Sequence, residues 1–275
     1  MERSAANMRE LEAQVKTCQL CRLSKTRTQA VPGEGNTRTE VMFIGEGPGY
    51  HEDKQGRPFV GAAGQFLNEL LGISGLERDA VFITNVVKCR PPNNRDPLPD
   101  ETAACAPYLE RQIALINPRV IVTLGRHSMT MFFPGERISQ IHGTARMVDG
   151  RMCVAMYHPA AGLHQASLAD IIRADFRKLP VYLEQSRKVA SPPAKVVEER
   201  IEVAVEARES VVHEAETGTV LDAPTPVELA PAEEMPEQAQ AAEQAEPEAA
   251  KPLTRTRAKR ATKASEYKQM SLFEL

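Results

Sequence analysis

The chain has 275 residues, a net charge of −3, no tryptophan and five cysteines. Its length allows one sizeable domain with additional material. It contains no apolar run of about 18 residues and no basic, apolar, small-residue pattern at its amino terminus, so neither a membrane span nor a secretory signal is predicted. We therefore expect a cytoplasmic protein with no membrane partner, in a reducing compartment where the cysteines form no disulfide framework.

The charge is distributed unevenly along the chain. Residues 1–197 hold 25 Lys or Arg and 20 Asp or Glu, whereas residues 198–250 hold 15 Asp or Glu, two Arg and no aromatic residue. Such an acidic stretch buries too little apolar surface to offset its ordering entropy. We therefore expect a folded domain at 1–190, an acidic disordered tether at 191–250 and a basic segment at 251–275. The modestly basic body gives weak support for a polyanionic partner.

Short apolar runs alternate with helical patterns through the first 185 residues. The runs at 40–44, 80–88, 119–125 and 152–159 predict strands, and the segments at 61–75, 100–116, 126–133 and 167–185 predict helices. A further helix is expected before Cys18. This alternation predicts an α/β fold with a mostly parallel central sheet flanked by helices.

Polar and glycine-rich segments follow the predicted strands. In parallel sheets, ligands bind outside the carboxyl ends of the strands. Those ends carry the loop at 45–59, Asn85, Gly125 and His158. The pattern therefore predicts one cleft lined by these residues, whereas the other histidines are left without a role.

Four of the cysteines suggest a metal centre. Cys18 and Cys21 form a CxxC pair, Cys89 ends the second predicted strand, and Cys105 lies on the helix after it. Four thiolates suit structural zinc or an iron–sulfur cluster, and one close pair joined to two lone cysteines favours the cluster without deciding between them. The alternative is that Cys89 and Cys105 are ordinary small buried residues, which is also how we interpret Cys153.

Several motifs occur together in one order. They are CxxC at 18–21, GEGPG at 45–49, GRPFVG at 56–61, TNVVKCRPPNNRDP at 84–97, Cys105, and YHPAA at 157–161. Between about residues 8 and 185 the chain thereby resembles the family 4 uracil-DNA glycosylases, which carry a 4Fe-4S cluster. The resemblance implies a uracil-DNA glycosylase-like fold that hydrolyses the N-glycosidic bond of deoxyuridine in DNA, and it implies Cys18, Cys21, Cys89 and Cys105 as the cluster ligands.

The resemblance also implies roles for the residues that contact the base. Phe59 is expected to stack on the flipped uracil. The Asn85 amide is expected to accept from N3 and donate to O4, a pattern that cytosine does not match. His158 is expected to be a neutral imidazole that donates to uracil O2 and stabilises the departing anion. Gly45 and Gly47 allow the backbone to approach the base closely.

Other residues are expected to act on the sugar and the DNA strand. Glu46 and Glu52 are candidates for orienting water or balancing the sugar cation, with no division of labour between them. Arg90 lies in a donor-rich loop that suits phosphate contacts. Leu163, in an expected loop at 160–165, is a candidate wedge for the space that the flipped base leaves.

The last residues suggest a protein partner. The segment QMSLF at 269–273 resembles the bacterial sliding-clamp-binding motif, with Gln269, Leu272 and Phe273 at its matching positions. Such a peptide docks its apolar side chains in a groove, and a long tether lets it do so while the catalytic body searches DNA. We expect a monomer that is tethered to the clamp in this way.

Three alternatives remain at this point. One is a relative on the same fold that prefers another base or traps the abasic sugar covalently, although the histidine-containing insertion of that branch has no counterpart at 90–97. Another is a non-catalytic iron–sulfur adaptor, which would need no base pocket of the kind formed by Phe59, Asn85 and His158. The third is a zinc-binding scaffold.

Overall fold

The structure is a computed structural model that describes residues 2–189, with side chains from residue 6 onward. The expected tether at 191–250, the basic segment at 251–275, and Gln269, Leu272 and Phe273 lie outside the described residues. Within residues 2–189, no helix is both long enough and apolar enough to cross a lipid bilayer.

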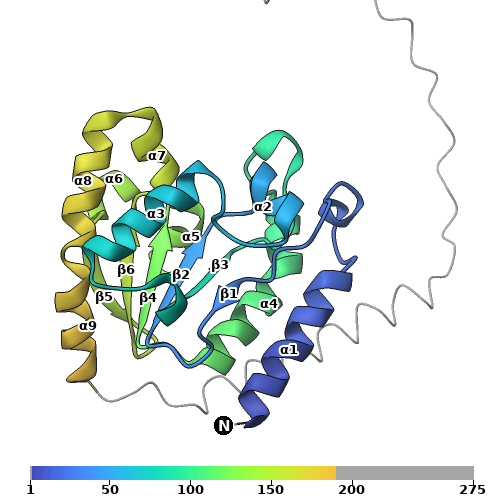
Figure 1. Cartoon of the computed structure of the whole chain (residues 1–275), viewed down its shortest axis with the longest axis horizontal. Coiled ribbons are helices and arrows are strands. Elements are labelled where there is room, and N and C mark those ends of the chain that lie inside the picture. The colour runs from blue at the N-terminus through green and yellow to red at the C-terminus, as the bar shows by residue number, and fades with distance from the viewer. Residues whose placement is uncertain (1, 190–275) are drawn as a thin grey trace, which may run out of the picture. The chain divides into compact units, whose positions relative to one another are not determined.

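A six-stranded mixed sheet forms the centre of the domain (Figure 1). Its order is β1 (Glu34–Gly35), β3 (Phe82–Asn85), β2 (Val41–Gly45), β4 (Val120–Leu124), β6 (Arg151–Met156) and β5 (Thr144–Val148). The four central strands are parallel, and the two edge strands are antiparallel to their neighbours. This arrangement confirms the predicted α/β fold with a mostly parallel sheet. In register, Gly45 pairs with Asn85, so two predicted site residues lie side by side at the carboxyl ends of adjacent strands.

Helices cover both faces of this sheet. They are α1 (Glu2–Thr17), α2 (Tyr50–Gln55), α3 (Ala62–Ile73), α4 (Pro99–Ile116), α5 (Arg126–Thr130), α6 (Ile138–Ile141), α7 (Pro159–His164), α8 (Ala166–Phe176) and α9 (Leu179–Arg187). Short 3-10 turns span Arg22–Lys25, Arg78–Ala80 and Pro92–Asn94.

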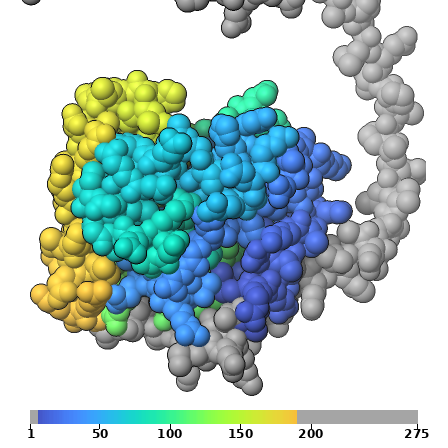
Figure 2. All heavy atoms as spheres, viewed as in Figure 1, coloured from blue at the N-terminus to red at the C-terminus, as the bar shows by residue number. Residues whose placement is uncertain are grey.

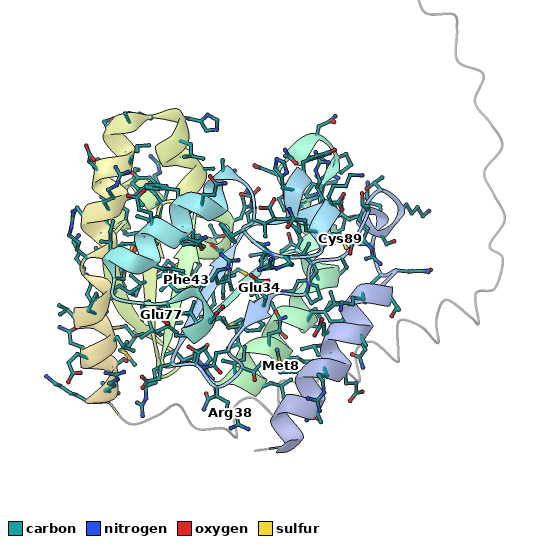
Figure 3. All side chains as sticks on the ribbon, viewed as in Figure 1. Met8, Glu34, Arg38, Phe43, Glu77 and Cys89 are labelled. Atoms are coloured by element: carbon teal, nitrogen blue, oxygen red, sulfur yellow. The ribbon has the colours of Figure 1, made fainter. Side chains whose placement is uncertain are left out.

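Two apolar cores follow from the alternation of side chains along each strand. Met42 on β2 packs in one core with residues of α1 and α4, among them Met8. Its neighbour Phe43 packs in the other core with residues of α3 and α8, among them Phe176. Figure 3 labels Met8 and Phe43 on these two sides of the sheet, and Figure 2 shows the α3 segment adjoining the α8 segment over the second core.

Several boundaries differ from the prediction. The loop expected at 45–59 contains α2, and the loop expected at 160–165 belongs mostly to α7. The helix expected at 167–185 is divided into α8 and α9, because Pro180 lacks the N–H that a continuous helix needs and instead lies in the first turn of α9. The expected strand at 80–88 ends at Asn85, and the helix expected at 126–133 ends at Thr130.

Candidate active site

A cavity of about 430 Å³ lies at the carboxyl ends of the central strands. The predicted residues that line it are Glu46, Gly47, Glu52, Phe59, Asn85 and His158, and they are joined by Pro48, Gly49, Ala63, Pro91, Asn94, Arg95, Ala160 and His164. The volume falls in the range of small-molecule sites. The structure therefore brings most of the predicted base-contacting and acidic residues to one cavity.

Gly45 leaves the space that two of these residues occupy. A Cβ built at Gly45 would lie 2.7 Å from Cζ of the Phe59 ring and closer still to Oδ1 of Asn85. Any side chain at this position would push these two groups away from the end of the sheet. Glycine is therefore needed here for a steric reason, since it leaves the room in which Phe59 and Asn85 pack beside each other.

The backbone of Phe59 is held in an unusual conformation. Its φ is +51°, in the left-handed region, which costs a residue with a side chain on the order of 1–3 kcal/mol. Arg78 Nη2 donates to the carbonyl of Pro58 at 2.6 Å, and Glu52 Oε1 accepts from the amides of Val60 and residue 61 at 2.8 and 2.9 Å. These bonds on either side of Phe59 hold its backbone in this conformation. The Phe59 ring stacks with the His158 ring at a centroid distance of 5.5 Å.

Asn85 carries an unpartnered buried oxygen. The residue is 1% exposed, and its Oδ1 has no hydrogen-bond donor among the described residues. Leaving a buried acceptor unpaired costs about 1–3 kcal/mol, and such a group calls for an explanation. Because Asn85 also lines the cavity, a donor on a bound ligand would satisfy this oxygen.

His158 is held in one tautomer. Its Nδ1 accepts a hydrogen bond from the backbone amide of Ala160 at 3.1 Å, so the ring proton lies on Nε2. Burial lowers the pKa of His158 to about 4, against the opposing effect of the Glu52 charge. At neutral pH, His158 therefore supplies one neutral N–H donor to the cavity wall.

Glu46 belongs to a group of charged residues beside the cavity. Its Oε2 lies 3.7 Å from His127 Nε2, and the same nitrogen lies 3.2 Å from Asp96 Oδ2. Burial raises the pKa of Glu46, whereas the nearby His127 lowers it and Asp96 raises it further. The sequence interpretation left His127 and the cavity-lining His164 without a role. His127 lies three residues after the carboxyl end of β4 at Leu124, and this position could have identified it.

The two predicted DNA contacts lie outside this cavity. Arg90 Nε donates to Asn94 Oδ1 at 2.8 Å, and the Arg90 guanidinium lies 5.2 Å from the centroid of the exposed Tyr50 ring. Since Asn94 lines the cavity, Arg90 lies close to its rim. Leu163, on α7, is 50% exposed and borders a separate hollow of about 330 Å³.

The four predicted ligand cysteines gather at one end of the first core. Cys89 and Cys105 are buried, and Cys18 and Cys21 are half-buried and pack against the same core (Figure 3 labels Cys89). Arg27 links two of these cysteines, since its Nη1 donates to Cys89 Sγ at 2.9 Å and its Nη2 donates to the carbonyl of Cys18 at 2.8 Å. A hydrogen bond from a cationic side chain to a cysteine sulfur favours the thiolate form of that cysteine.

A buried lysine lies between these cysteines and Asn85. Lys88 Nζ donates to Thr84 Oγ1, to the Asn85 carbonyl and to Gln112 Oε1, each at 2.7 Å, and all three acceptors are neutral. Burial lowers the pKa of Lys88 to about 8, an effect that negative charge on Cys105 and Cys89 opposes. A buried cation needs an anion nearby, and metal-bound thiolates would supply it. The four cysteines, with the cationic Arg27 and Lys88 beside them, therefore fit an anionic metal centre.

Comparison with known proteins shows to which family this chain belongs. Residues 32–179 match the model of the uracil DNA glycosylase superfamily. The chain belongs to the uracil-DNA glycosylase superfamily. It is 50% identical over 187 residues to a type-4 uracil-DNA glycosylase of Sulfurisphaera tokodaii, a match that covers 63% of this chain and 83% of the relative.

Relatives of two types show the same relationship. A type-4 uracil-DNA glycosylase of Thermotoga maritima is 44% identical over 183 residues, which cover 65% of this chain and 95% of the relative. A type-5 uracil-DNA glycosylase of Thermus thermophilus is 38% identical over 149 residues, which cover 46% of this chain and 68% of the relative. The superfamily segment contains the whole cavity described above.

Proposed function

We propose that this protein is a uracil-DNA glycosylase that flips deoxyuridine out of DNA and hydrolyses its N-glycosidic bond, releasing uracil and leaving an abasic site. The observation that carries the proposal is the buried, unpartnered Oδ1 of Asn85 in a cavity that also holds the Phe59 ring and a neutral His158. A base inside a duplex is out of reach of any such cavity, so it must leave the stack first.

The cavity residues match uracil and reject cytosine. Phe59 offers an aromatic face to the pyrimidine. Asn85 Oδ1 accepts from uracil N3–H, and the amide NH₂ of Asn85 donates to O4. Cytosine has an unprotonated N3, which would face Oδ1 as a second acceptor and leave the buried oxygen unpaired. Since unpaired buried groups are costly, this arrangement is a strong basis for discrimination.

Bond cleavage places negative charge on uracil and positive character on the sugar. The Nε2–H of His158 donates to uracil O2, which stabilises the departing anion. Glu46 orients the water whose oxygen bonds to C1′ while the bond from C1′ to N1 breaks, and the water proton leaves through the carboxylate. Glu52 keeps Phe59 in place through its bonded oxygen, and its negative charge favours the sugar cation.

Two further residues engage the DNA strand. Arg90 lies near the cavity rim and contacts a phosphate there, a contact that positions the strand without reading its sequence. The exposed Leu163 on α7 fills the space that the flipped nucleotide leaves. We further propose that the domain at 1–190 acts as a monomer and that the protein is cytoplasmic.

Cys18, Cys21, Cys89 and Cys105 hold a 4Fe-4S cluster. Sulfur ligands of a single zinc, each about 2.3 Å from the metal, lie roughly 3.8 Å apart. Among the side chains described, those of residues 6–189, no three cysteine sulfurs come within 4.8 Å of one another, so they are not arranged here as the ligands of a single zinc. When bound, the cluster cross-links the amino-terminal segment to the chain after β3 and to α4.

The glycosylase proposal is tested with a labelled oligonucleotide that contains one deoxyuridine. We expect the iron-replete full chain to release uracil, so that alkali then cleaves the strand at that position. Matched strands with thymine or cytosine are expected to stay intact. Intact uracil strands after incubation with folded, iron-replete protein would refute the activity, and scission at another base would assign a different substrate.

We also propose that the acidic segment at 191–250 acts as a tether and that the basic segment at 251–275 ends in a clamp-binding peptide at 269–273. The support is the match of QMSLF to the bacterial motif. We expect the full chain to bind a purified bacterial sliding clamp in a pull-down, and the double substitution Leu272→Ala, Phe273→Ala to abolish binding while leaving uracil release unchanged. Equal retention of both proteins would contradict the assignment.

A further inference from the structure

We propose that His127 is a positioning residue for the hydrolysis, one that keeps Glu46 in its carboxylate form beside the reacting sugar. This inference rests on the proposed glycosylase function. It assigns a task to a side chain that lies behind the cavity wall, and it separates Glu46 from Glu52, whose Oε1 is already engaged by two backbone amides.

Three segments bring the charges together. Glu46 follows β2, Asp96 lies in the segment between β3 and α4, and His127 belongs to α5. One side-chain nitrogen or oxygen atom from each of the three lies within 4.8 Å of those from the other two. His127 Nε2 is 3.2 Å from Asp96 Oδ2, within hydrogen-bond reach, and 3.7 Å from Glu46 Oε2, an ion-pair distance. His127 therefore lies beside both carboxylates.

One further charge faces the same nitrogen. Arg126 Nη2 lies 2.6 Å from Asp96 Oδ2 and 3.1 Å from His127 Nε2. The positive charge of Arg126 offsets the negative charge of Asp96. Because a guanidinium can only donate, Arg126 can bond to His127 Nε2 only when that nitrogen carries no proton. Among the described residues, the charges that act on the Glu46 pKa are those of Asp96, Arg126 and His127, although Glu52 and Arg95 line the same cavity.

The balance of these charges determines whether Glu46 is protonated or ionised. Burial and the Asp96 carboxylate both favour its protonated form, whereas Arg126 and the protonated imidazole of His127 favour the ionised form. A protonated Glu46 cannot accept the proton of the attacking water. Removing the imidazole would therefore leave Glu46 protonated over a wider pH range. The main chain at Glu46 is also held in place, since the Glu46 carbonyl accepts from the amide of Val87 at 3.1 Å.

The experiment measures the single-turnover rate of uracil release against pH for the full, iron-replete chain. In His127→Gln and His127→Ala we expect the acid-side midpoint to move up by about one pH unit, which lowers the rate below the midpoint about tenfold. Above the midpoint the rate should return to within about threefold of wild type. Asp96→Asn should move the midpoint in the opposite direction, because it removes the repelling charge.

A control removes the same kind of contact elsewhere. His142 Nδ1 lies 2.7 Å from Asp175 Oδ2, and His142→Gln should leave the midpoint in place. A uniform loss of rate at every pH in both His127 variants would show a merely structural role and overturn the inference, as would an unmoved midpoint. If wild type releases no uracil, the proposed function fails instead. If wild type is active and the midpoint stays, only the role of His127 fails.

Discussion

Replacing Asn85 by aspartate is expected to lower the single-turnover rate of uracil release by about a thousandfold or more. The substitution keeps the size of the side chain but replaces the amide donor by a second acceptor, so uracil O4 would face an anionic oxygen in a buried site. Sites built to hydrogen-bond one partner reject a mismatched one by about 10⁴ or more. The measurement is the rate with enzyme in excess over a deoxyuridine oligonucleotide.

The control for this variant is Asn36→Asp. Asn36 is exposed and does not line the cavity, so this substitution adds the same charge without touching the base. We expect Asn36→Asp to keep the wild-type rate within about twofold, as surface substitutions usually do. A rate for Asn85→Asp within tenfold of wild type, in protein that melts normally, would remove Asn85 from base recognition.

Replacing Cys89 by serine is expected to remove the iron and most of the stability of the domain. Cys89 is buried, its sulfur accepts from Arg27, and the charge of Lys88 lies nearby. Loss of the proposed metal centre would leave both cations without its negative charge. Loss of a metal site belongs to the few changes that cost about 4 kcal/mol or more. Iron content, the brown absorbance and the free energy of unfolding measure the effect.

Cys153 provides a matched control in the same chain. It is fully buried on β6, and burial raises the pKa of its thiol to about 12, so it behaves as a small neutral core residue. We expect Cys153→Ser to keep its iron and absorbance, with a modest loss of stability. Equal iron content in the Cys89→Ser and Cys153→Ser proteins, or zinc in the wild type, would contradict the cluster assignment.

The fold was largely predictable because buried parallel strands read as short apolar runs. The segments at 40–44 and 119–125 match β2 and β4 closely, and the rule for strand ends then indicated the cavity. The edge strands were not predictable in the same way. β1 has two residues, and every residue of β5 is exposed or half-buried, so neither produces an apolar run.

Sequence patterns predicted only part of the candidate site. The neighbouring positions of Gly45 and Asn85 follow from two parallel strands, which the sequence indicated. The positive φ of Phe59 depends on bonds from Arg78 and Glu52, which come from elsewhere in the chain and leave no local signal. The tautomer of His158 likewise depends on the amide that begins α7, where a loop was expected.

The most direct test compares deoxyuridine with 3-methyldeoxyuridine in otherwise identical oligonucleotides. The methyl group removes the one donor that the buried Oδ1 of Asn85 can accept, while the glycosidic bond stays the same. The account predicts release of uracil and a rate for 3-methyluracil lower by about a thousandfold or more, as in the Asn85→Asp variant. Comparable rates for the two bases would show that Asn85 does not read the N3 position and would contradict the account.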